Sequence, residues 1–374
     1  MINRSACLAM LFCLCISIPA YAGPRKVIAV GDSFPAVKTD YGLSAEQLAY
    51  FGIDRGLLSL FTKNSFSIAD INAEIIFVEF FNNYCSSCQA QAPVMNDVYK
   101  AVQKDPVLRN KVRFVGIGAG NNEREVAQFK ERHEVPFPLI PDQRFSFYDA
   151  MGEPGGTPFM LILKKRAHEA VVVGTHKGLT PNASFFIKSL TTAAEQDIST
   201  LTSRVTEKDI PRDDTRRLEL PFTQKQTLDT VAKSMAAACP GCAPAADIQQ
   251  IKTASGKTLS TATVDAEKGK KLTLYSSLIS EQPVCDVCHG VHYIITFDGS
   301  GIIRDFTPVH LTKYGNVEWN EYDIETMRRQ LMGKKLKKEL VFDPAQDAIS
   351  TATMSSALIY KGINELREVY KELD

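Results

Sequence analysis

Six cysteines fall into three pairs that share one spacing: Cys85/Cys88, Cys239/Cys242 and Cys285/Cys288. With two residues between them, both sulfurs of a pair can reach each other, one metal ion or the edge of a haem. The other three of the nine cysteines lie within the first 22 residues. The sequence therefore predicts a protein that transfers electrons or holds a redox centre.

The first 22 residues have the composition of a cleavable export signal. Arg4 supplies the positive charge, residues 7–18 form an apolar stretch too short to span a membrane, and Ala20-Tyr21-Ala22 is a small-x-small cleavage site. The alternative is an uncleaved membrane anchor. We expect the mature chain in the periplasm or another extracytoplasmic part of the cell envelope, where disulfides persist. Membrane contact is expected only through an uncleaved signal or a membrane-bound redox partner.

Length and charge narrow the class of protein. The chain has 374 residues, 44% of them hydrophobic, which suits two globular domains. It carries 43 basic and 43 acidic residues, and loss of Arg4 leaves 42 against 43, a net charge of −1. This balance argues against nucleic acid as a partner. A polar stretch after residue 198 predicts the following division: signal 1–22, first domain 23–198, linker 199–225 and second domain 226–374.

The first domain alternates between strand-like and helix-like segments. Apolar runs predict buried strands, and amphipathic runs predict helices. The expected order is strand 75–81, helix 85–101, strand 112–117, helix 123–133, strands 159–163 and 170–173, and helix 181–190. This order predicts an α/β fold in which helices flank a sheet.

Cys85 lies where the strand 75–81 gives way to a helix. A thiol there is close to the unpaired N–H groups and positive end of the helix, which favour the thiolate. Cys88, one turn further, is expected to be more buried, so Cys85 is the predicted nucleophile and Cys88 the resolving thiol. Glu79 lies inside the apolar strand, which predicts a raised pKa and transfer of a proton from Cys88. The alternative is a strand-end carboxylate that faces water.

The run from Val78 to Cys88 resembles the active-site segment of thioredoxin, and Pro93 matches the proline of its active-site helix. Gly156-Thr157-Pro158 resembles the cis-proline loop that faces the dithiol in that family. The resemblance covers residues 24–195. It implies a thioredoxin-like fold, catalytic roles for Cys85 and Cys88, and a cis bond before Pro158.

The N-terminal part and two substitutions refine this resemblance. Gly31–Pro35 is similar to the extracytoplasmic branch of thiol–disulfide oxidoreductases. Tyr84 replaces the usual tryptophan, and Ser86-Ser87 replaces Gly-Pro. Because the dipeptide between the cysteines tunes the redox potential, the direction of electron flow stays open. The Pro-x-x-x-Thr-x-x-Cys sequence of peroxiredoxins is absent.

The second domain is predicted to be α+β. A hairpin turn is expected at Asp298-Gly299-Ser300-Gly301. The other expected elements are helix 227–238, strands 271–278, 292–297 and 302–309, and helix 356–373.

The segment Asp347–Ser356 resembles the flavin-attachment sequence of FMN-binding domains, Asp-x-x-Ser-Gly-Ala-Thr-x-Ser-Ser. The resemblance implies covalent FMN on Thr353, with Asp347, Ser350 and Ser355 as the other motif residues. A phosphate at a helix N-terminus would meet unpaired N–H groups. Thr351 replaces the glycine, and the usual Glu-Thr-Pro-Gly stretch is not evident at 311–315. The alternative is a Ser/Thr-rich helix cap without a cofactor.

Cys285-Asp286-Val287-Cys288-His289 has the spacing of a haem c attachment site, in which His289 would be the proximal ligand. His292, His310 or a methionine would be the second axial ligand of the haem iron. Two alternatives stay open. One is a disulfide or dithiol, and the other is zinc shared with Cys239 and Cys242.

Together these patterns predict an exported thiol–disulfide oxidoreductase that uses Cys85 and Cys88, with a second domain that relays electrons. Its expected partners are protein disulfide clients or another redox protein. The alternative is a non-enzymatic assembly factor, or a metal- or haem-binding factor, of the cell envelope.

Overall fold

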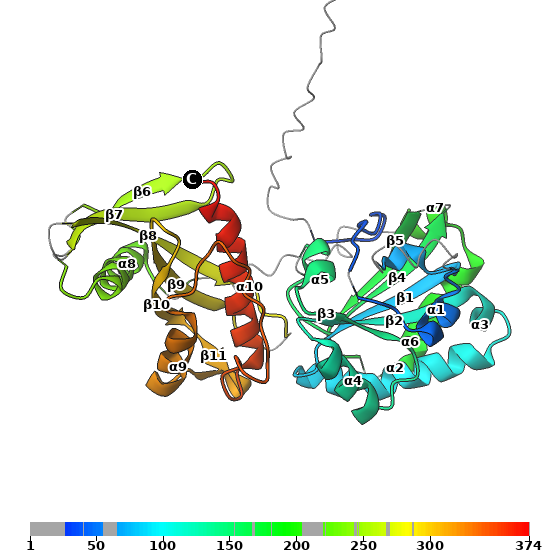
Figure 1. Cartoon of the computed structure of the whole chain (residues 1–374). Coiled ribbons are helices and arrows are strands. Elements are labelled where there is room, and N and C mark those ends of the chain that lie inside the picture. Colours follow the sequence, from blue (N-terminus) through cyan, green and yellow to red (C-terminus); the bar gives the residue numbers. More distant parts are fainter. Residues whose placement is uncertain are drawn as a thin grey trace, which may run out of the picture.

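The computed structural model shows two domains that lie side by side (Figure 1). The predicted signal at 1–22 and most of the predicted linker lie outside the described residues. No helix in the described part is both long and apolar enough to cross a membrane. The described residues are 27–39, 41–54, 66–152, 154–166, 169–180, 182–203, 220, 222–242, 245, 247–266, 270–285 and 288–373.

A five-stranded sheet forms the centre of the first domain, in the order β3-β2-β1-β4-β5. β1 pairs in parallel with β2, which pairs in parallel with β3, whereas β4 runs antiparallel to both β1 and β5. The four predicted strands are present, and β3 is an additional one. The bounds are β1 Ile75–Phe81, β2 Val112–Ala119, β3 Leu139–Asp142, β4 Phe159–Arg166 and β5 Glu169–Lys177.

Side-chain alternation along β1 separates the two faces of this sheet. Phe77 and Phe81 pack in one cluster with the face of α2 that carries Cys88, and Val78 and Phe80 pack in another. The three predicted helices are α2, α4 and α6. The helices of this domain are α1 Ala45–Phe51, α2 Ser86–Lys104, α3 Leu108–Lys111, α4 Glu123–Arg132, α5 Ser146–Ala150, α6 Ala183–Glu195 and α7 Ile198–Thr202, with the 3-10 turn η2 Ile68–Asp70.

Helices occupy both ends of the predicted linker 199–225. Helix α7 occupies Ile198–Thr202, because Asp197 caps it by accepting a hydrogen bond from the Thr200 N–H at 2.7 Å. At the other end, Thr223 caps helix α8, which begins at Gln224.

The second domain is α+β, as predicted, and its sheet is an antiparallel meander in the order β10-β9-β8-β7-β6. Helix α8 covers one face, where it packs with Ile294, and α10 covers the other, with Tyr293 and Ile295. The bounds are α8 Gln224–Ala238, β6 Gln249–Lys252, β7 Thr258–Ala266, β8 Lys270–Glu281, β9 Val291–Asp298, β10 Ile303–His310, β11 Thr312–Lys313, η6 Tyr314–Asn316, β12 Val317–Glu318, α9 Glu321–Leu331 and α10 Thr353–Tyr370. Strands β6 and β7 and helix α9 were not predicted.

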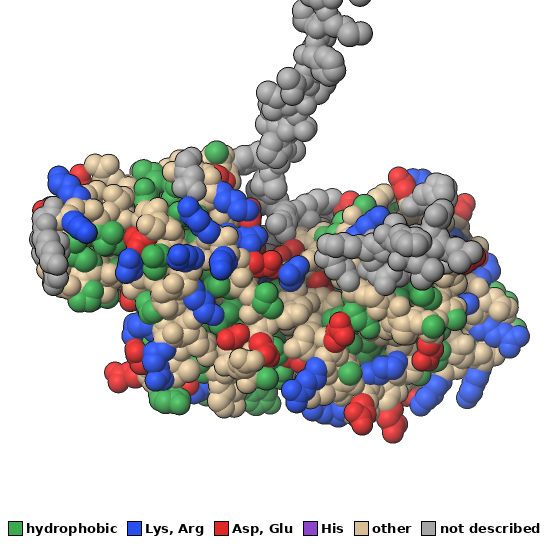
Figure 2. All heavy atoms as spheres, in the orientation of Figure 1, with side chains coloured by type: hydrophobic (Ala, Val, Ile, Leu, Met, Phe, Trp, Pro, Cys, Tyr) green, Lys and Arg blue, Asp and Glu red, His purple; other side chains and the backbone are tan. Residues whose placement is uncertain are grey.

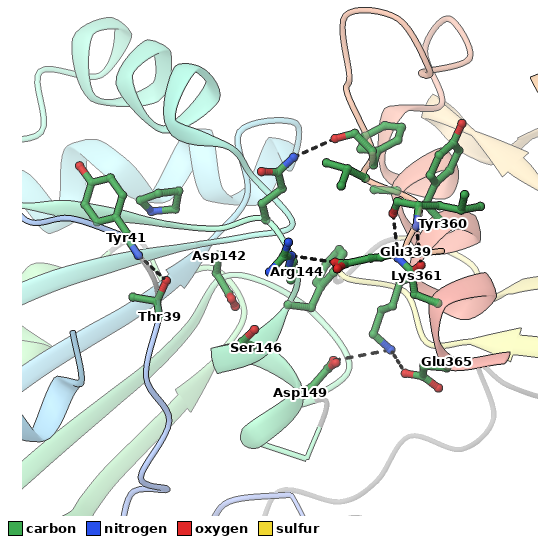
Figure 3. A pocket seen from close by; sticks show the side chains of 18 of the residues that line it. Thr39, Tyr41, Asp142, Arg144, Ser146, Asp149, Glu339, Tyr360, Lys361 and Glu365 are labelled. Carbon is green, nitrogen blue, oxygen red and sulfur yellow. Dashed lines mark hydrogen bonds and ion pairs between the residues drawn. The ribbon is translucent and has the colours of Figure 1, made fainter. Parts of the chain in front are cut away.

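Polar contacts join the two domains. The Gln143 side chain donates to the Phe342 carbonyl at 2.8 Å, and Arg144 pairs with Glu339 at 2.9 Å. Lys361 of α10, whose side chain is 8% exposed, pairs with Asp149 of the first domain at 3.6 Å (Figure 3). These contacts border a cavity of about 690 Å³. In the space-filling view, acidic and basic side chains lie side by side where the domains meet (Figure 2).

Candidate active site

Cys85 occupies the junction between β1 and α2, as predicted. It is the N-cap residue of α2, and its sulfur accepts a hydrogen bond from the Cys88 N–H at 3.4 Å. Asn82 fixes the preceding turn, because its amide donates to the Ala119 carbonyl at 2.6 Å and accepts from the Tyr84 N–H at 2.8 Å. The helix N-terminus therefore points at the Cys85 sulfur.

The Thr157–Pro158 loop faces this sulfur. The peptide bond between Thr157 and Pro158 is cis, which confirms the prediction. The Cys85 thiol donates to the Thr157 carbonyl at 3.3 Å. The loop thus brings backbone groups next to the dithiol just before β4 begins.

Glu79 is buried beneath the active site. It follows Phe77 by two residues and precedes Phe81 by two, so it points to the sheet face that α2 covers. It is 3% exposed, and its Oε1 atom makes no hydrogen bond to any residue that the structure describes. Burial raises its pKa to about 8. The alternative of a carboxylate facing water is therefore wrong, and the raised pKa is as predicted.

The second domain places Cys285 against Cys85. The Thr157 N–H donates to the Val284 carbonyl at 2.7 Å, and the Thr157 hydroxyl donates to the same oxygen at 2.8 Å. Thr157 and Cys285 form a β-bridge, and the Cys285 and Cys85 side chains are hydrogen-bonded. No feature of the sequence predicted this contact, because 200 residues separate the two cysteines.

This docking changes the environment of the dithiol. Cys85 is 1% exposed and Cys88 0%. Hydrogen bonds with the Cys285 and Cys88 thiols, and then burial, raise the pKa of Cys85. The helix N-terminus favours the Cys85 thiolate, whereas in the docked arrangement the neighbouring thiols and burial raise the pKa of Cys85 and favour the protonated thiol.

Cys239 and Cys242 are in a different state, since they form a disulfide at the C-terminal end of α8. Among the residues that the structure describes, no three His, Cys, Asp or Glu side chains are gathered so that they could hold a metal ion. Zinc shared by these cysteines with Cys285 and Cys288 remains a prediction.

A cavity of about 460 Å³ lies at the domain boundary and is lined by residues of both domains. Its lining includes Cys285, Cys288, Thr353 and Ser355. Thr353 is the first residue of α10, so the cavity lies at the N-terminal end of that helix. The structure thus brings the predicted flavin-attachment residue and the third cysteine pair to one cavity.

The other flavin-motif residues make local contacts. Ser350 is exposed, and the Asp347 carboxylate accepts from the Asp343 N–H at 2.9 Å. The Ser355 hydroxyl donates to the Thr312 carbonyl at 2.7 Å. The N-cap residue of α10 is Ala352, which makes no side-chain cap. The alternative in which Ser350, Thr353 and Ser355 cap this helix is thus not what the structure shows.

His289, His292 and His310 lie near one another. The ring centroids of His289 and His310 are 5.6 Å apart, and those of His310 and His292 are 6.3 Å apart. His292 is buried, which lowers its pKa to about 4, and its Nδ1 lies 2.9 Å from the Ser280 hydroxyl. Haem attachment at Cys285 and Cys288 remains a prediction.

Residues 57–188 match the model of the AhpC/TSA family. The chain is 25% identical over 108 residues to "Thiol-disulfide oxidoreductase ResA" of Geobacillus thermodenitrificans, covering 29% of this chain and 59% of that protein. It is 23% identical over 109 residues to the protein of that name from Geobacillus kaustophilus, again covering 29% and 59%. The chain thus spans less than two thirds of the length of these relatives.

Solved structures similar to this chain include StoA from Bacillus subtilis, with 16% identity, 32% of this chain and 84% of that chain covered, and a TM-score of 0.27. Another is a secreted disulfide oxidoreductase of Mycobacterium tuberculosis, with 17% identity, 35% and 90% coverage, and a TM-score of 0.28. The family match lies within the first domain, which is a thioredoxin-like α/β domain.

Proposed function

We propose that this protein is a thiol–disulfide oxidoreductase of the cell envelope. The observation that carries the proposal is the position of Cys85, which caps α2 and lies 3.3 Å from the Thr157 carbonyl beside the cis-proline. The likeness of this domain to relatives named thiol–disulfide oxidoreductase supports it. The predicted signal at 1–22 supports the extracytoplasmic location.

In the proposed reaction, the Cys85 thiolate attacks one sulfur of a protein disulfide and the other sulfur leaves as a thiolate. Cys88 then attacks Cys85, which releases the second client sulfur and leaves a Cys85–Cys88 disulfide. The client gains two electrons and two protons. The ionised form of Glu79 accepts the proton of Cys88, and a carboxyl group with a pKa of about 8 exchanges protons readily near neutral pH.

Protein clients require the second domain to move. Cys85 is covered in the docked arrangement, and the Thr157 N–H that would pair with a client backbone already pairs with Val284. A client strand would therefore replace the segment around Val284, and the dithiol becomes available when the domains separate. Separation would also remove the Cys285 hydrogen bond that raises the pKa of Cys85.

Reduction of insulin disulfides tests this function. The mature protein should reduce insulin at catalytic levels, and Cys85→Ser should abolish turnover. Cys88→Ser should trap a mixed disulfide with a client, whereas Cys85→Ser should trap none. A trap formed only by Cys85→Ser would reverse the two roles. Stoichiometric metal without turnover would instead support the non-enzymatic assembly factor.

We further propose that the second domain holds FMN at Thr353. Bound FMN would supply electron exchange between a donor and a dithiol. Three features support the fit. The cavity of about 460 Å³ is within the range of ligand sites. The first turn of α10, which has no side-chain cap, offers N–H groups to a phosphate. Thr351, in place of the motif glycine, has φ 60°, a conformation that glycine adopts readily.

The absorption spectrum and intact mass test the flavin. Protein from the envelope of its native host should be yellow and heavier than its sequence by one FMN less water, and Thr353→Ala should remove both signals. Ser255→Ala, at an exposed position outside the motif, is the matched control and should keep both signals. In the family that the motif resembles, a dedicated transferase attaches the FMN, so expression in the cytoplasm should give unmodified chain. An unmodified mass from the native envelope would reject flavin attachment.

A further inference from the structure

The segment that carries Cys285 is bound as a protein client would be. Its Val284 carbonyl accepts two hydrogen bonds from Thr157, at 2.7 Å from the backbone N–H and 2.8 Å from the hydroxyl. Cys285 forms a β-bridge with Thr157. Addition of an extended segment to exposed backbone groups is a common mode of peptide recognition. Here the added segment comes from the same chain.

The sulfur chemistry of this segment matches the site it occupies. Cys285 is 6% exposed and belongs to one buried cluster with Cys85 and Cys88, against which Cys288 packs. The segment thus brings a second cysteine pair to the first. We propose that Cys285/Cys288 is the internal redox partner of Cys85/Cys88, with Cys285 joined to Cys85 during transfer; this inference rests on the proposed function of the Cys85/Cys88 dithiol.

The transfer balances within the chain. Cys85, as a thiolate, attacks Cys285 of a Cys285–Cys288 disulfide, so the Cys85–Cys285 bond forms and Cys288 leaves as a thiolate that takes up a proton. Cys88 then loses its proton and attacks Cys85, which releases Cys285. Two electrons and two protons pass from the first pair to the second. The reverse sequence returns them, since each step is a reversible exchange.

The positions of the two sulfurs assign their roles. Cys285 is the one that the β-bridge holds at Thr157, next to the sulfur of Cys85. Cys288 is less buried and, together with Cys285, lines the cavity that Thr353 also lines. Cys288 is therefore the sulfur that leaves, and the Cys285/Cys288 pair lies between the Cys85/Cys88 dithiol and that cavity.

Trapping the Cys85–Cys285 intermediate tests the assignment in the full mature chain. In Cys88→Ser/Cys288→Ser, brief treatment with oxidised glutathione should join Cys85 to Cys285. Trypsin cuts after Lys63, Lys100, Lys271 and Arg304, so the product is peptide 64–100 linked to peptide 272–304. The matched control is Cys88→Ser/Cys285→Ser, which keeps Cys288 and should give at least tenfold less of this linked pair. Equal yields, or a larger yield from the control, would overturn the assignment of Cys285.

A kinetic measurement separates exchange from mere proximity. Oxidised wild-type protein and oxidised Cys85→Ser/Cys88→Ser are each treated with one equivalent of dithiothreitol. The Cys285–Cys288 disulfide should be reduced at least tenfold faster in wild type, as followed by alkylation and peptide mapping. The Cys239–Cys242 disulfide should react alike in both proteins. Equal rates at Cys285/Cys288 would reject the internal partner. Insulin reduction separates the two proposals, because it fails only if the proposed function itself is wrong.

Discussion

Two cysteine pairs with the same spacing lie at opposite ends of helices. Cys85 caps the N-terminus of α2, where the helix dipole and unpaired N–H groups stabilise negative charge on sulfur. Cys239 is the C-cap of α8, where the dipole has the opposite sign, and it is joined to Cys242 as a disulfide. The spacing alone therefore does not decide the chemistry. The end of the helix at which a pair lies separates a thiol suited to attack from a closed bridge.

The third pair lies at neither kind of helix end. Cys285 follows β8 in an irregular segment, and its environment is supplied by the first pair. This segment buries Cys85, and the burial opposes the effect of the helix N-terminus on the Cys85 thiol. Variants that undock the domains, or that change one helix end at a time, therefore test whether the helix end decides the chemistry of each pair.

Removal of the Lys361 charge has the largest expected effect. Lys361 pairs with Glu281 at 2.8 Å and with Asp149 across the domain boundary, and the Glu281 side chain is only 6% exposed. Lys361→Met removes one partner of a buried ion pair, which should lower the free energy of unfolding by about 3 kcal/mol. It should also increase the rate at which Cys85 is alkylated.

Lys371→Met is the matched control, because Lys371 is 58% exposed and pairs at the surface with Glu368, three residues before it. Its expected cost is below about 1 kcal/mol. Denaturant unfolding and timed alkylation measure both variants. Equal alkylation of Cys85 in the two variants would show that docking does not protect this thiol.

Glu79→Gln tests the buried carboxyl beneath the reactive pair. Its pKa rises from 4.5 to about 8 on folding, so the folded state holds a proton that the unfolded state releases above pH 4.5. The contribution of protonated Glu79 to stability is complete below pH 4.5 and is lost as pH rises to about 8. Glu79→Gln should therefore gain stability over wild type with increasing pH, by a few kcal/mol at pH 8.

Thermal unfolding at pH 4.5 and pH 8 measures this difference. Asp142, whose pKa burial also raises to about 8, contributes the same slope to both proteins and cancels. A gain that does not change with pH would mean that Glu79 is ionised in the folded protein. Slower release of a trapped client in Glu79→Gln would support the proton transfer from Cys88.

Opening the Cys239–Cys242 bridge should affect stability and leave the redox activity intact. The two cysteines are three residues apart, so the bridge closes a short loop and contributes roughly 2 kcal/mol by loop-closure entropy. Cys239→Ser/Cys242→Ser should lower the free energy of unfolding by this amount and reduce insulin at the wild-type rate. A large loss of insulin reduction would instead show that Cys239 and Cys242 take part in catalysis, as Cys85 does.

The smallest expected effect concerns a third helix end, the N-terminus of α10. Thr351 holds φ 60°, which is costly for a β-branched residue. Thr351→Gly should relieve this strain and stabilise the protein by up to about 1 kcal/mol, offset in part by the entropy of glycine. Thermal unfolding measures the change. A clear loss of stability would mean that the Thr351 hydroxyl, which donates to the Ser350 carbonyl at 2.6 Å, matters more than the backbone angle.

Local patterns predicted the parts of the site that adjacent residues build. An apolar run followed by Cys85 and an amphipathic stretch gave β1, the turn and α2, and a carboxyl within that run gave the buried Glu79. The edge strand β6 escaped prediction because most of its side chains are exposed and carry no apolar alternation. The meeting of Cys285 with Cys85 also escaped, since it depends on how two separately folded domains dock. The cavity that Cys288 and Thr353 share has the same origin.

The paired hydrogen bonds from Thr157 to Val284 have a kinetic consequence. A tethered segment competes with every client at a high effective concentration, which is in the millimolar range for short flexible tethers. The apparent affinity for a client then falls by the fraction of molecules that are undocked. At saturating client, the rate of mixed-disulfide formation reaches a plateau set by undocking and no longer depends on client concentration. The chain thereby limits its own reactivity toward disulfides in its surroundings.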